Sequence, residues 1–493
     1  MTAPRVAVVG AGISGLAAAH RLRGLLGPAA TITVLDKSAR VGGVLHTVDL
    51  AGVAYDIGAE AYLLARPEVP ALLAELGLDD QVVHATTATP SIRAGGRTMP
   101  LPSATLLGIP TSRADLSEVL TPAGAARAAE EPELPLRWGG GDVALGPLLS
   151  DRFGPELAQR LVDPLLGGVY AGRVDSLGLR ATIPTLAAAL DAGATSLTAA
   201  ADTAIPAPAP DGERRPVFGA LRGGYRTLLD ALVGQSGAQL ALGTTVRGLH
   251  RRDGGWRLEL GSAPTPEFFD ADAVVLAVPA PVLRRLLAAP VPAASAAVAG
   301  VELASSALVA LAFRAADAAD QPTTSGVLMA TGEPLAAKAF TYSARKWPHL
   351  AAESSGGLVR LRASIGRYGE AAALQVDDDE LVARVSSDLS ALTGITADPV
   401  AGYVQRWGGG LPQYGVGHLD RVGELRCAVA GEPWLAVAGS VLDGVGVPAC
   451  IGTAHAAAAR IAEQLRAGQL PAERPAPGTD GSMSTWPEPT TRS

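Results

Sequence analysis

Residues Arg5 to Gly15 read RVAVVGAGISG, and this stretch decides the fold. The apolar run Arg5–Val9 predicts a β-strand, the run Ile13–Leu26 predicts a helix, and Thr31–Leu35 predicts the next strand. Strand, helix and strand follow one another with short connections, as in a βαβ unit. The N-terminal part of the chain is therefore expected to form a parallel sheet with helices packed against it.

Three glycines lie between the expected strand and the expected helix. Gly10 permits a tight turn, Gly12 lets the backbone approach a pyrophosphate, and Gly15 lets the helix pack closely on the strand. The unpaired N–H groups at a helix N-terminus favour an anion there. Asp36 follows Gly15 by 21 residues, near the spacing of about 20 at which an acid binds a ribose hydroxyl. An aspartate that only caps a turn is the alternative, but the complete unit favours dinucleotide binding.

The segment after Asp36 favours FAD over NAD. It reads Arg40-Val41-Gly42-Gly43, and it resembles the second glycine pair that approaches FAD in the flavin amine oxidase and protoporphyrinogen oxidase superfamily. An ordinary Gly-Gly turn is the alternative interpretation, and it would leave an NAD-binding module open.

Composition and charge exclude several classes of protein. The chain has 493 residues, which suggests two or three domains, and a net charge of −8, which argues against a nucleic-acid binder. Its two cysteines, Cys427 and Cys450, cannot form a disulfide framework, and the seven histidines show no metal-site spacing. No apolar stretch reaches the ~20 residues of a membrane span. We expect a cytoplasmic protein with no metal, no transmembrane span and at most peripheral membrane contact.

The remaining chain divides into helical, strand-rich and polar parts. Breaker-rich stretches at Thr121–Asp142 and Ile205–Arg215 flank a mostly helical pattern, Val143–Ala201. A hairpin is expected around Asp253-Gly254-Gly255. Further expected elements are strands at 273–278 and 435–439 and helices at 281–287, 378–392 and 451–465. After Gly468 the chain is rich in Pro, Ser and Thr and is expected to be disordered.

Several longer runs are similar to one family, the oxygen-dependent protoporphyrinogen/coproporphyrinogen oxidases of haem synthesis. These runs are DIGAE at 56–60, VDPLLGGVYAG at 162–172, FGALRGG at 218–224, RW at 406–407, LPQYGVGH at 411–418 and AGSVLDGVGVPACI at 438–451. Each is modestly specific, and their common order and spacing are strongly specific. The resemblance covers nearly all of the chain except the tail.

The resemblance implies an α/β (α+β) fold with three parts. A Rossmann-like FAD-binding domain is expected from 1–70, 215–295 and 405–467. A substrate-binding sheet domain is expected from 71–90 and 296–404, and a mainly helical domain from 91–214, with 468–493 as the disordered tail. In membrane-bound relatives the part that corresponds to 143–201 touches the bilayer, whereas here it looks buried or partner-facing.

The glycine pattern and the resemblance together predict the cofactor-binding positions. They are Gly10, Ala11, Gly12, Ile13, Ser14, Gly15, Asp36, Lys37, Arg40, Gly42, Gly43, Val44, Gly58, Ala59, Glu60, Ala61, Val246, Trp407, Gly439, Val445, Gly446 and Val447. The resemblance implies substrate-lining positions at Gly167, Gly168 and Tyr170, and no catalytic side chain is identified. Cys450 begins the last expected helix, where a thiol can be activated, but a small packed residue is the preferred interpretation.

Three positions depart from the family pattern. Asp36 stands where the family usually has glutamate, although both accept ribose hydroxyls. Ala59-Glu60-Ala61 differs from the residues that many members have after the preceding glycine. Pro90 stands where some eukaryotic members carry an arginine beside the substrate, so that propionate contact does not carry over. Arg93 and Arg97 lie nearby and are interpreted as solvated loop cations.

The family reaction removes six electrons and six hydrogens from a porphyrinogen, with flavin as the redox group and oxygen as the oxidant. Leu107–Thr111 and Lys346–His349 look like the Gram-positive-type branch, so coproporphyrinogen III is the preferred substrate. Protoporphyrinogen IX is the alternative. More distant alternatives are a flavin amine oxidase or desaturase and a non-catalytic flavoprotein that carries porphyrin. The expected partners are the porphyrinogen, oxygen and a further haem-pathway enzyme.

Overall fold

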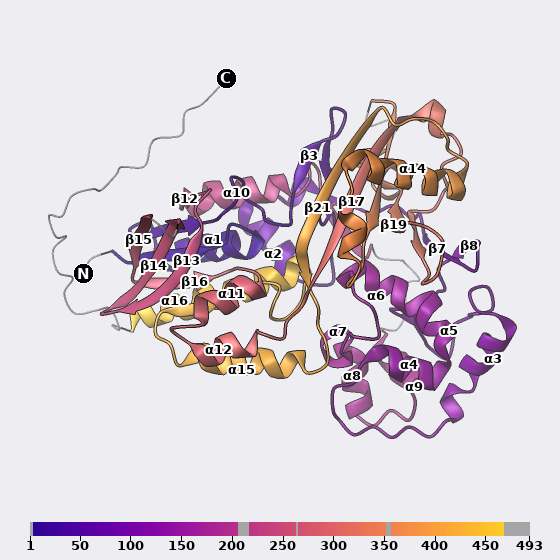
Figure 1. The fold of residues 1–493 in the computed structure, drawn as a ribbon, viewed down its shortest axis with the longest axis horizontal. Helices are drawn as coiled ribbons and strands as arrows, with labels where there is room; N and C mark the ends of the chain where they lie inside the picture. The colour runs from indigo at the N-terminus through magenta and orange to yellow at the C-terminus, as the bar shows by residue number, and fades with distance from the viewer. Residues whose placement is uncertain (1–2, 206–215, 263–264, 352–355, 468–493) are drawn as a thin grey trace.

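The computed structural model describes residues 3–205, 216–262, 265–351 and 356–467. The expected linker beyond Ile205 and the expected disordered tail after Gly468 lie outside these ranges. The described chain forms two lobes, of which one is built around a parallel sheet, and the other combines a long mixed sheet with a group of helices (Figure 1).

The first lobe is centred on a five-stranded parallel sheet. In spatial order its strands are β12 (Gln239–Ala241), β2 (Thr31–Leu35), β1 (Arg5–Val9), β16 (Ala273–Leu276) and β22 (Leu435–Val437). The central strands read as unbroken apolar runs because helices and strands cover both faces.

Different elements cover the two faces of this parallel sheet. One face packs against α1 (Ile13–Leu26) and α16 (Val447–Arg466), and α10 (Arg226–Ser236) and α2 (Glu68–Leu76) pack in turn on these two helices. The other face packs against a three-stranded antiparallel sheet and three helices. These are β13 (Val246–Arg252), β14 (Gly255–Ser262), β15 (Thr265–Ala271), α11 (Ala280–Leu287), α12 (Pro292–Ala297) and α15 (His418–Ala430).

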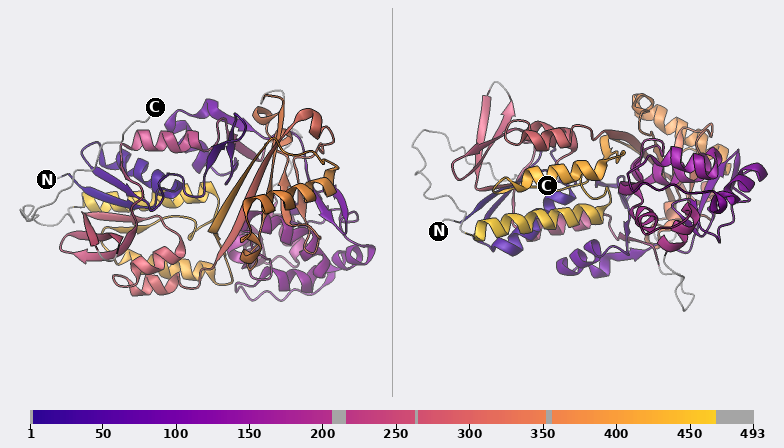
Figure 2. Two further views of the ribbon diagram at one scale, coloured as in Figure 1. Left: turned by 45° about the horizontal axis from the view of Figure 1, so that its top comes forward. Right: turned by 90° about the horizontal axis from the view of Figure 1, so that it is seen from below.

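The second lobe contains a seven-stranded mixed sheet. Its order is β21 (Ala401–Pro412), β17 (Leu303–Arg314), β20 (Leu358–Ile365), β19 (Ala337–Thr341), β18 (Gly326–Met329), β7 (Pro90–Ala94) and β8 (Arg97–Pro100). Helix α14 (Asp378–Thr393) covers one face. The opposite face meets the first lobe, where the guanidinium of Arg360 donates to the carbonyls of Leu50, at 2.9 Å, and Ala51, at 2.7 Å. Figure 2 shows this sheet standing between the parallel-sheet lobe and the helices.

Short strands join these larger layers. The hairpin of β3 (Thr47–Asp49) and β4 (Ala54–Asp56) follows the second glycine pair. A small sheet has the order β5 (Tyr62–Leu63), β11 (Phe218–Leu221) and β6 (Val82–His84), and β9 (Thr105–Leu106) pairs with β10 (Ile109–Pro110). The short helix α13 (Ser343–Lys346) follows β19.

The helical group lies beside one end of the mixed sheet (Figure 1). Its helices are α3 (Pro122–Ala129), α4 (Leu145–Phe153), α5 (Pro155–Leu157), α6 (Asp163–Tyr170), α7 (Leu179–Thr182), α8 (Pro184–Asp191) and α9 (Leu197–Ala204). A π-helical turn, Ala158–Val162, joins α5 to α6. Helix α6 contacts β18 and β19, so it connects the helical core to the mixed sheet.

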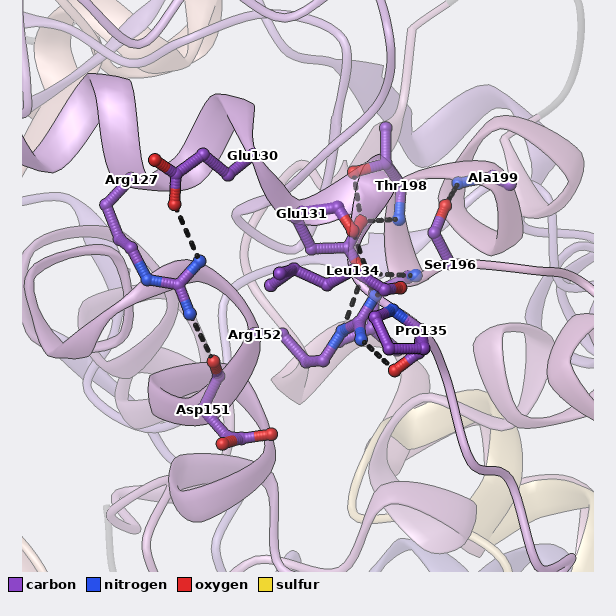
Figure 3. A network of polar contacts seen from close by, with 11 residues as sticks. Arg127, Glu130, Glu131, Leu134, Pro135, Asp151, Arg152, Ser196, Thr198 and Ala199 are labelled. Carbon is purple, nitrogen blue, oxygen red and sulfur yellow. Dashed lines mark hydrogen bonds and ion pairs between the residues drawn. The ribbon is translucent and has the colours of Figure 1, made fainter.

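A buried ion pair ties the helical group together (Figure 3). Glu131 is fully buried, and one of its carboxylate oxygens accepts from Nη2 of Arg152 on α4 at 2.6 Å. The same carboxylate accepts from the N–H groups of Leu197, at 2.8 Å, and Thr198, at 3.1 Å. Glu131 therefore neutralises an arginine of one helix and caps the N-terminus of another.

The predicted fold class, an α/β (α+β) fold with a Rossmann-like part, is confirmed. The predicted three-part division of the chain stays a prediction. Some elements nevertheless cross the predicted boundaries. Strands β7 and β8 extend the mixed sheet into residues expected to be helical, and β21 begins before residue 405. Helix α2 packs in the core of the first lobe, although most of it was assigned to the substrate part. Within the described ranges, none of the helices has the length and hydropathy that a bilayer crossing requires.

Candidate cofactor groove and substrate cavity

The predicted glycine turn lies where the carboxyl ends of β1, β2 and β16 meet. Gly10 has a φ of +110°, and its N–H donates to the carbonyl of Leu35 at 2.7 Å. A methyl group on Gly10 would lie 2.2 Å from the carbonyl oxygen of Ala277, and one on Gly15 would lie 1.7 Å from that of Gly10. Both positions therefore require glycine for packing, before any ligand is considered.

At a second set of glycines a methyl group would meet no clash. The nearest atom to a methyl group on Gly12 would be the Cα of Gly43 at 4.0 Å, and on Gly439 it would be Oγ of Ser14 at 3.8 Å. At Gly446 the nearest atom would be Cδ of Pro448, at 3.7 Å. Small side chains at these three positions would meet no clash, so the backbones leave room for a ligand to approach closely. We call the surface of Gly12, Gly439 and Gly446 the glycine groove.

Two helices begin at the glycine groove without a side-chain cap. Gly12 precedes α1 and Gly446 precedes α16, and neither helix has a side-chain hydrogen bond at its N-cap. The N–H groups of a first helical turn lack intrahelical acceptors and favour a negative partner. The starts of α1 and α16 thus offer free amides to an anionic or electron-rich ligand in the groove.

Asp36 is held in place by the backbone around it. Its carboxylate accepts from the N–H of Ala11 through Oδ2 and from the N–H of Ser38 through Oδ1, both at 2.7 Å. Asp36 follows β2 at the same sheet edge as Gly10, as the predicted ribose contact requires. Of the other positions expected nearby, Lys37 is exposed, whereas Val246 is buried and its carbonyl accepts from Arg285 at 2.9 Å.

Arg40 and Trp407 come together from opposite ends of the chain. The guanidinium of Arg40 donates to the carbonyl of Gly43 at 2.8 Å and lies 5.8 Å from the centre of the Trp407 ring. The indole N–H of Trp407 donates to the carbonyl of Ile57 at 3.0 Å. His46 packs edge-on against Trp407, and burial, followed by the nearby charge of Arg40, lowers the pKa of His46. This cluster fixes the second glycine pair against the mixed sheet and leaves Val44 exposed.

The carboxylate of Glu60 forms ion pairs with two cations of the second lobe. Oε1 accepts from Nζ of Lys346 at 2.6 Å, and Oε2 lies 3.2 Å from Arg362. Burial raises the pKa of Glu60, but Arg362 and Lys346 outweigh it and lower that pKa to about 2. Any cofactor contact of Glu60 would therefore use its backbone. A methyl group on the neighbouring Gly58 would lie 2.0 Å from the carbonyl of Val44, whereas Ala59 is exposed.

The predicted substrate positions are on α6 and differ in exposure. Gly168 is exposed, and a methyl group there would lie 3.9 Å from Leu328 of β18. Tyr170 is buried and packs on Tyr414, with 5.5 Å between ring centres. The hydroxyl of Tyr414 in turn donates to the carbonyl of Ser440. Three of the runs that carry the sequence resemblance thus meet at this point, and only part of α6 is open to a ligand.

The start of α16 joins the groove to the helical group. Val445 packs against the helical core, and Val447 is buried in the core of the first lobe. Burial raises the pKa of the Cys450 thiol to about 11, so this cysteine is not an activated nucleophile at neutral pH. The preferred interpretation of Cys450 as a packed residue agrees with its burial.

A cavity of about 230 Å³ lies beyond α6, at the end of the mixed sheet. Its walls include the cations Arg173, Lys338 and Arg367 and the carboxylates Glu333 and Glu370. None of these five residues is among the site positions predicted from the sequence. The sequence held one indication of Lys338. This lysine interrupts the apolar run AAKAF at 336–340, which is otherwise typical of a buried strand.

Comparisons with known proteins agree with this geometry. The sequence profile of the family described as flavin containing amine oxidoreductase matches residues 13–462. The coproporphyrinogen III oxidase of Mycobacterium tuberculosis (H37Rv) is 47% identical over 468 residues, which cover 95% of this chain and 99% of that protein. The coproporphyrinogen III oxidase of Bacillus subtilis is 30% identical, with 92% and 96% covered.

One solved structure closely matches the whole described arrangement. It comes from Exiguobacterium, and its description assigns it provisionally to the protoporphyrinogen oxidases. The two structures superpose with a TM-score of 0.80 at 30% identity, covering 94% of this chain and all of the other.

Proposed function

Because this chain belongs to the flavin-containing amine oxidoreductase family, and within it to the branch of the coproporphyrinogen III oxidases, we propose that it oxidises coproporphyrinogen III to coproporphyrin III in haem biosynthesis. The observation that carries this proposal is the 47% identity over 95% of the chain to a protein of that name. The reaction removes six electrons and six hydrogens, so three molecules of oxygen would leave as three of hydrogen peroxide.

The flavin of this site is proposed to be FAD, since the groove offers a contact for each part of a dinucleotide. The amides of α1 would hold the pyrophosphate, Asp36 the ribose, and the amides of α16 the ring. Bound there, the flavin supplies the acceptor for two electrons in each of three steps. Heat-released cofactor should therefore co-elute with FAD on chromatography, and FMN in its place would contradict this assignment.

The protein's own part in the reaction is binding and orientation. Gly168 of α6 presents an exposed surface without a side chain, and Leu328 of β18 presents an apolar surface next to it. The two together suit a flat macrocycle. Arg40 and Trp407 hold the second glycine pair against the mixed sheet, so the groove keeps its shape. The reaction needs no general acid and base at a fixed spacing.

The growth of porphyrin fluorescence tests the substrate assignment. Purified protein is mixed in air with coproporphyrinogen III or with protoporphyrinogen IX at equal concentration, and spontaneous oxidation is subtracted. We expect faster oxidation of coproporphyrinogen III, with three peroxides formed for each porphyrin. Much faster oxidation of protoporphyrinogen IX would favour the second candidate, which the description of the Exiguobacterium structure supports. Oxidation of neither would point to a porphyrin carrier.

The proposal includes a cytoplasmic location. Both cysteines are free, Cys427 exposed and Cys450 buried, as suits a reducing compartment. After lysis at physiological salt, the protein is expected in the supernatant of a high-speed spin. A further enzyme of haem synthesis is the proposed partner for handing on the product.

A further inference from the structure

The cavity beyond α6 has an excess of positive charge. Glu370 forms an ion pair with Arg173, and Glu333 lies 3.2 Å from Arg93 and accepts from the N–H of Gly96 at 3.1 Å. Both carboxylates of the cavity wall are thus matched with cations. Among the described residues, neither Lys338 nor Arg367 forms an ion pair, although the charge of Glu370 is felt at Lys338.

Lys338 is the more unusual of these two cations. The residue is only 7% exposed, and its ammonium group makes no hydrogen bond or ion pair with any residue that the structure describes. A buried ammonium without a partner is strongly unfavourable. Burial, followed by the charge of Arg367, lowers the pKa of Lys338 to about 7. Such a group in the wall of a cavity indicates a missing anion.

Arg367 also has an unused donor. Its Nη2 donates to the carbonyl of Met329 at 3.2 Å, while its Nε is buried and has no acceptor within the described part of the chain. The guanidinium is therefore held by one contact and retains a donor for a further partner. Two neighbouring cations with free donors suit a carboxylate.

The cavity adjoins the exposed end of α6. A methyl group on Gly167 would lie 3.9 Å from Nε of Arg367, while the next residue, Gly168, faces Leu328. Leu328 is followed directly by Met329, whose carbonyl Arg367 binds. A ring resting on Gly168 and Leu328 would therefore have its side arms within reach of the cavity.

We propose that this cavity receives a propionate carboxylate of the substrate, bound by Lys338 and Arg367, at a position where protoporphyrinogen IX carries a vinyl group. The proposal rests on the proposed function. Coproporphyrinogen III has four propionates and protoporphyrinogen IX has two. A vinyl group in this cavity would leave both cations buried and unpaired, so the cavity selects the tetra-carboxylate.

The test measures binding of the two porphyrin products to wild-type protein and to Lys338→Met, by fluorescence titration. Methionine keeps most of the length of the side chain and removes the ammonium group. We expect Kd for coproporphyrin III to rise at least tenfold and Kd for protoporphyrin IX to stay within twofold. Arg367→Met should act in the same direction. Arg384→Met, which removes a surface cation of α14 paired with Glu380, is the matched control and should change neither Kd.

Folding and function are separated by two further measurements. Because Lys338 is an unpaired buried charge, Lys338→Met should unfold at or above the wild-type temperature, so weaker binding would not reflect misfolding. An unchanged Kd for coproporphyrin III, or an equal rise for both porphyrins, would overturn the inference. If instead the wild-type protein fails to oxidise coproporphyrinogen III, the proposed function itself fails, whatever the variants bind.

Discussion

At the scale of single residues, Gly12 shows how a missing methyl group shapes the cofactor groove. Its φ of −72° is accessible to alanine, and an added methyl group would point into the groove with no protein atom within 3.9 Å. Gly12→Ala should therefore fold but bind flavin at least roughly tenfold more weakly, which corresponds to about 1.4 kcal/mol. The ratio of flavin to protein absorbance after gel filtration measures this loss.

Gly24→Ala is the matched control for Gly12→Ala on the same helix. Gly24 is exposed, and no atom lies within 4 Å of an added methyl group. This variant should keep its flavin and gain up to about 1 kcal/mol of helix stability. Equal flavin content in the two variants would show that α1 does not face the cofactor.

Lys338 predicts how substrate binding depends on pH. Its pKa, lowered by burial and then by Arg367 to about 7, makes the ammonium form predominant only below neutrality. A bound carboxylate favours that form, so binding of coproporphyrin III should weaken as pH rises, by roughly tenfold between pH 7 and 8.5. Fluorescence titration at several pH values measures the slope.

Lys338→Arg separates this titration from that of the neighbouring groups. The charged groups around the ammonium are Arg173, Glu333, Arg367 and Glu370, while Asp388 of α14 binds the N–H of the adjacent Ala337. Arginine keeps its charge throughout this pH range, so its slope should be nearly flat. A wild-type slope in Lys338→Arg would assign the titration to another group.

At the scale of elements, Glu131 tests what holds the helical group together. Replacing it with alanine leaves Arg152 buried without its carboxylate and removes the acceptor of two N–H groups at the start of α9. Breaking a buried pair in this way costs about 3–5 kcal/mol. Thermal unfolding should show a clear loss of stability for Glu131→Ala.

The adjacent residue provides the control for Glu131→Ala. Glu130 is 64% exposed at its side chain and lies 3.5 Å from Arg127, an ordinary surface pair (Figure 3). Glu130→Ala should change stability by less than about 1 kcal/mol. A loss as large as that of Glu131→Ala would mean that burial does not decide the effect.

Elements with local signals were predictable from the sequence. The bounds of β1, α1 and β2 match the expected ones, because apolar periodicity and the glycine turn act within a few residues. Helix α3 was missed inside the breaker-rich stretch Thr121–Asp142. There Thr121 caps the helix and Pro122 occupies its first turn, so the apparent breakers start a helix.

Elements defined by distant partners were not predictable in the same way. Strand β7 joins the mixed sheet through parallel pairing with β18, for example Ile92 with Leu328. No local pattern reports a partner more than two hundred residues away. For the same reason the ion pairs of Glu60 with Lys346 and Arg362 were not predictable. Nor was it predictable that the cations Lys338 and Arg367 lie in the wall of one cavity.

At the scale of the whole molecule, the chain assembles two binding regions from distant segments. The glycine groove combines the start of the first helix with the start of the last, and Arg40 and Trp407 support the glycine pair beside it. The cation-rich cavity combines Arg173, which follows α6, with the ends of β18 and β19 and with residues just after β20. On α6, Gly168 faces Leu328 and the neighbouring Gly167 faces Arg367 of the cavity wall, so this helix lies beside both regions.

A crystal structure of the protein with its flavin and coproporphyrin III tests this arrangement most directly. We predict the flavin along the glycine groove, the macrocycle against Gly168 and Leu328, and a propionate within hydrogen-bond distance of Lys338 and Arg367. A macrocycle bound away from α6, or a cavity beyond α6 that holds only solvent while all four propionates lie elsewhere, would contradict the account.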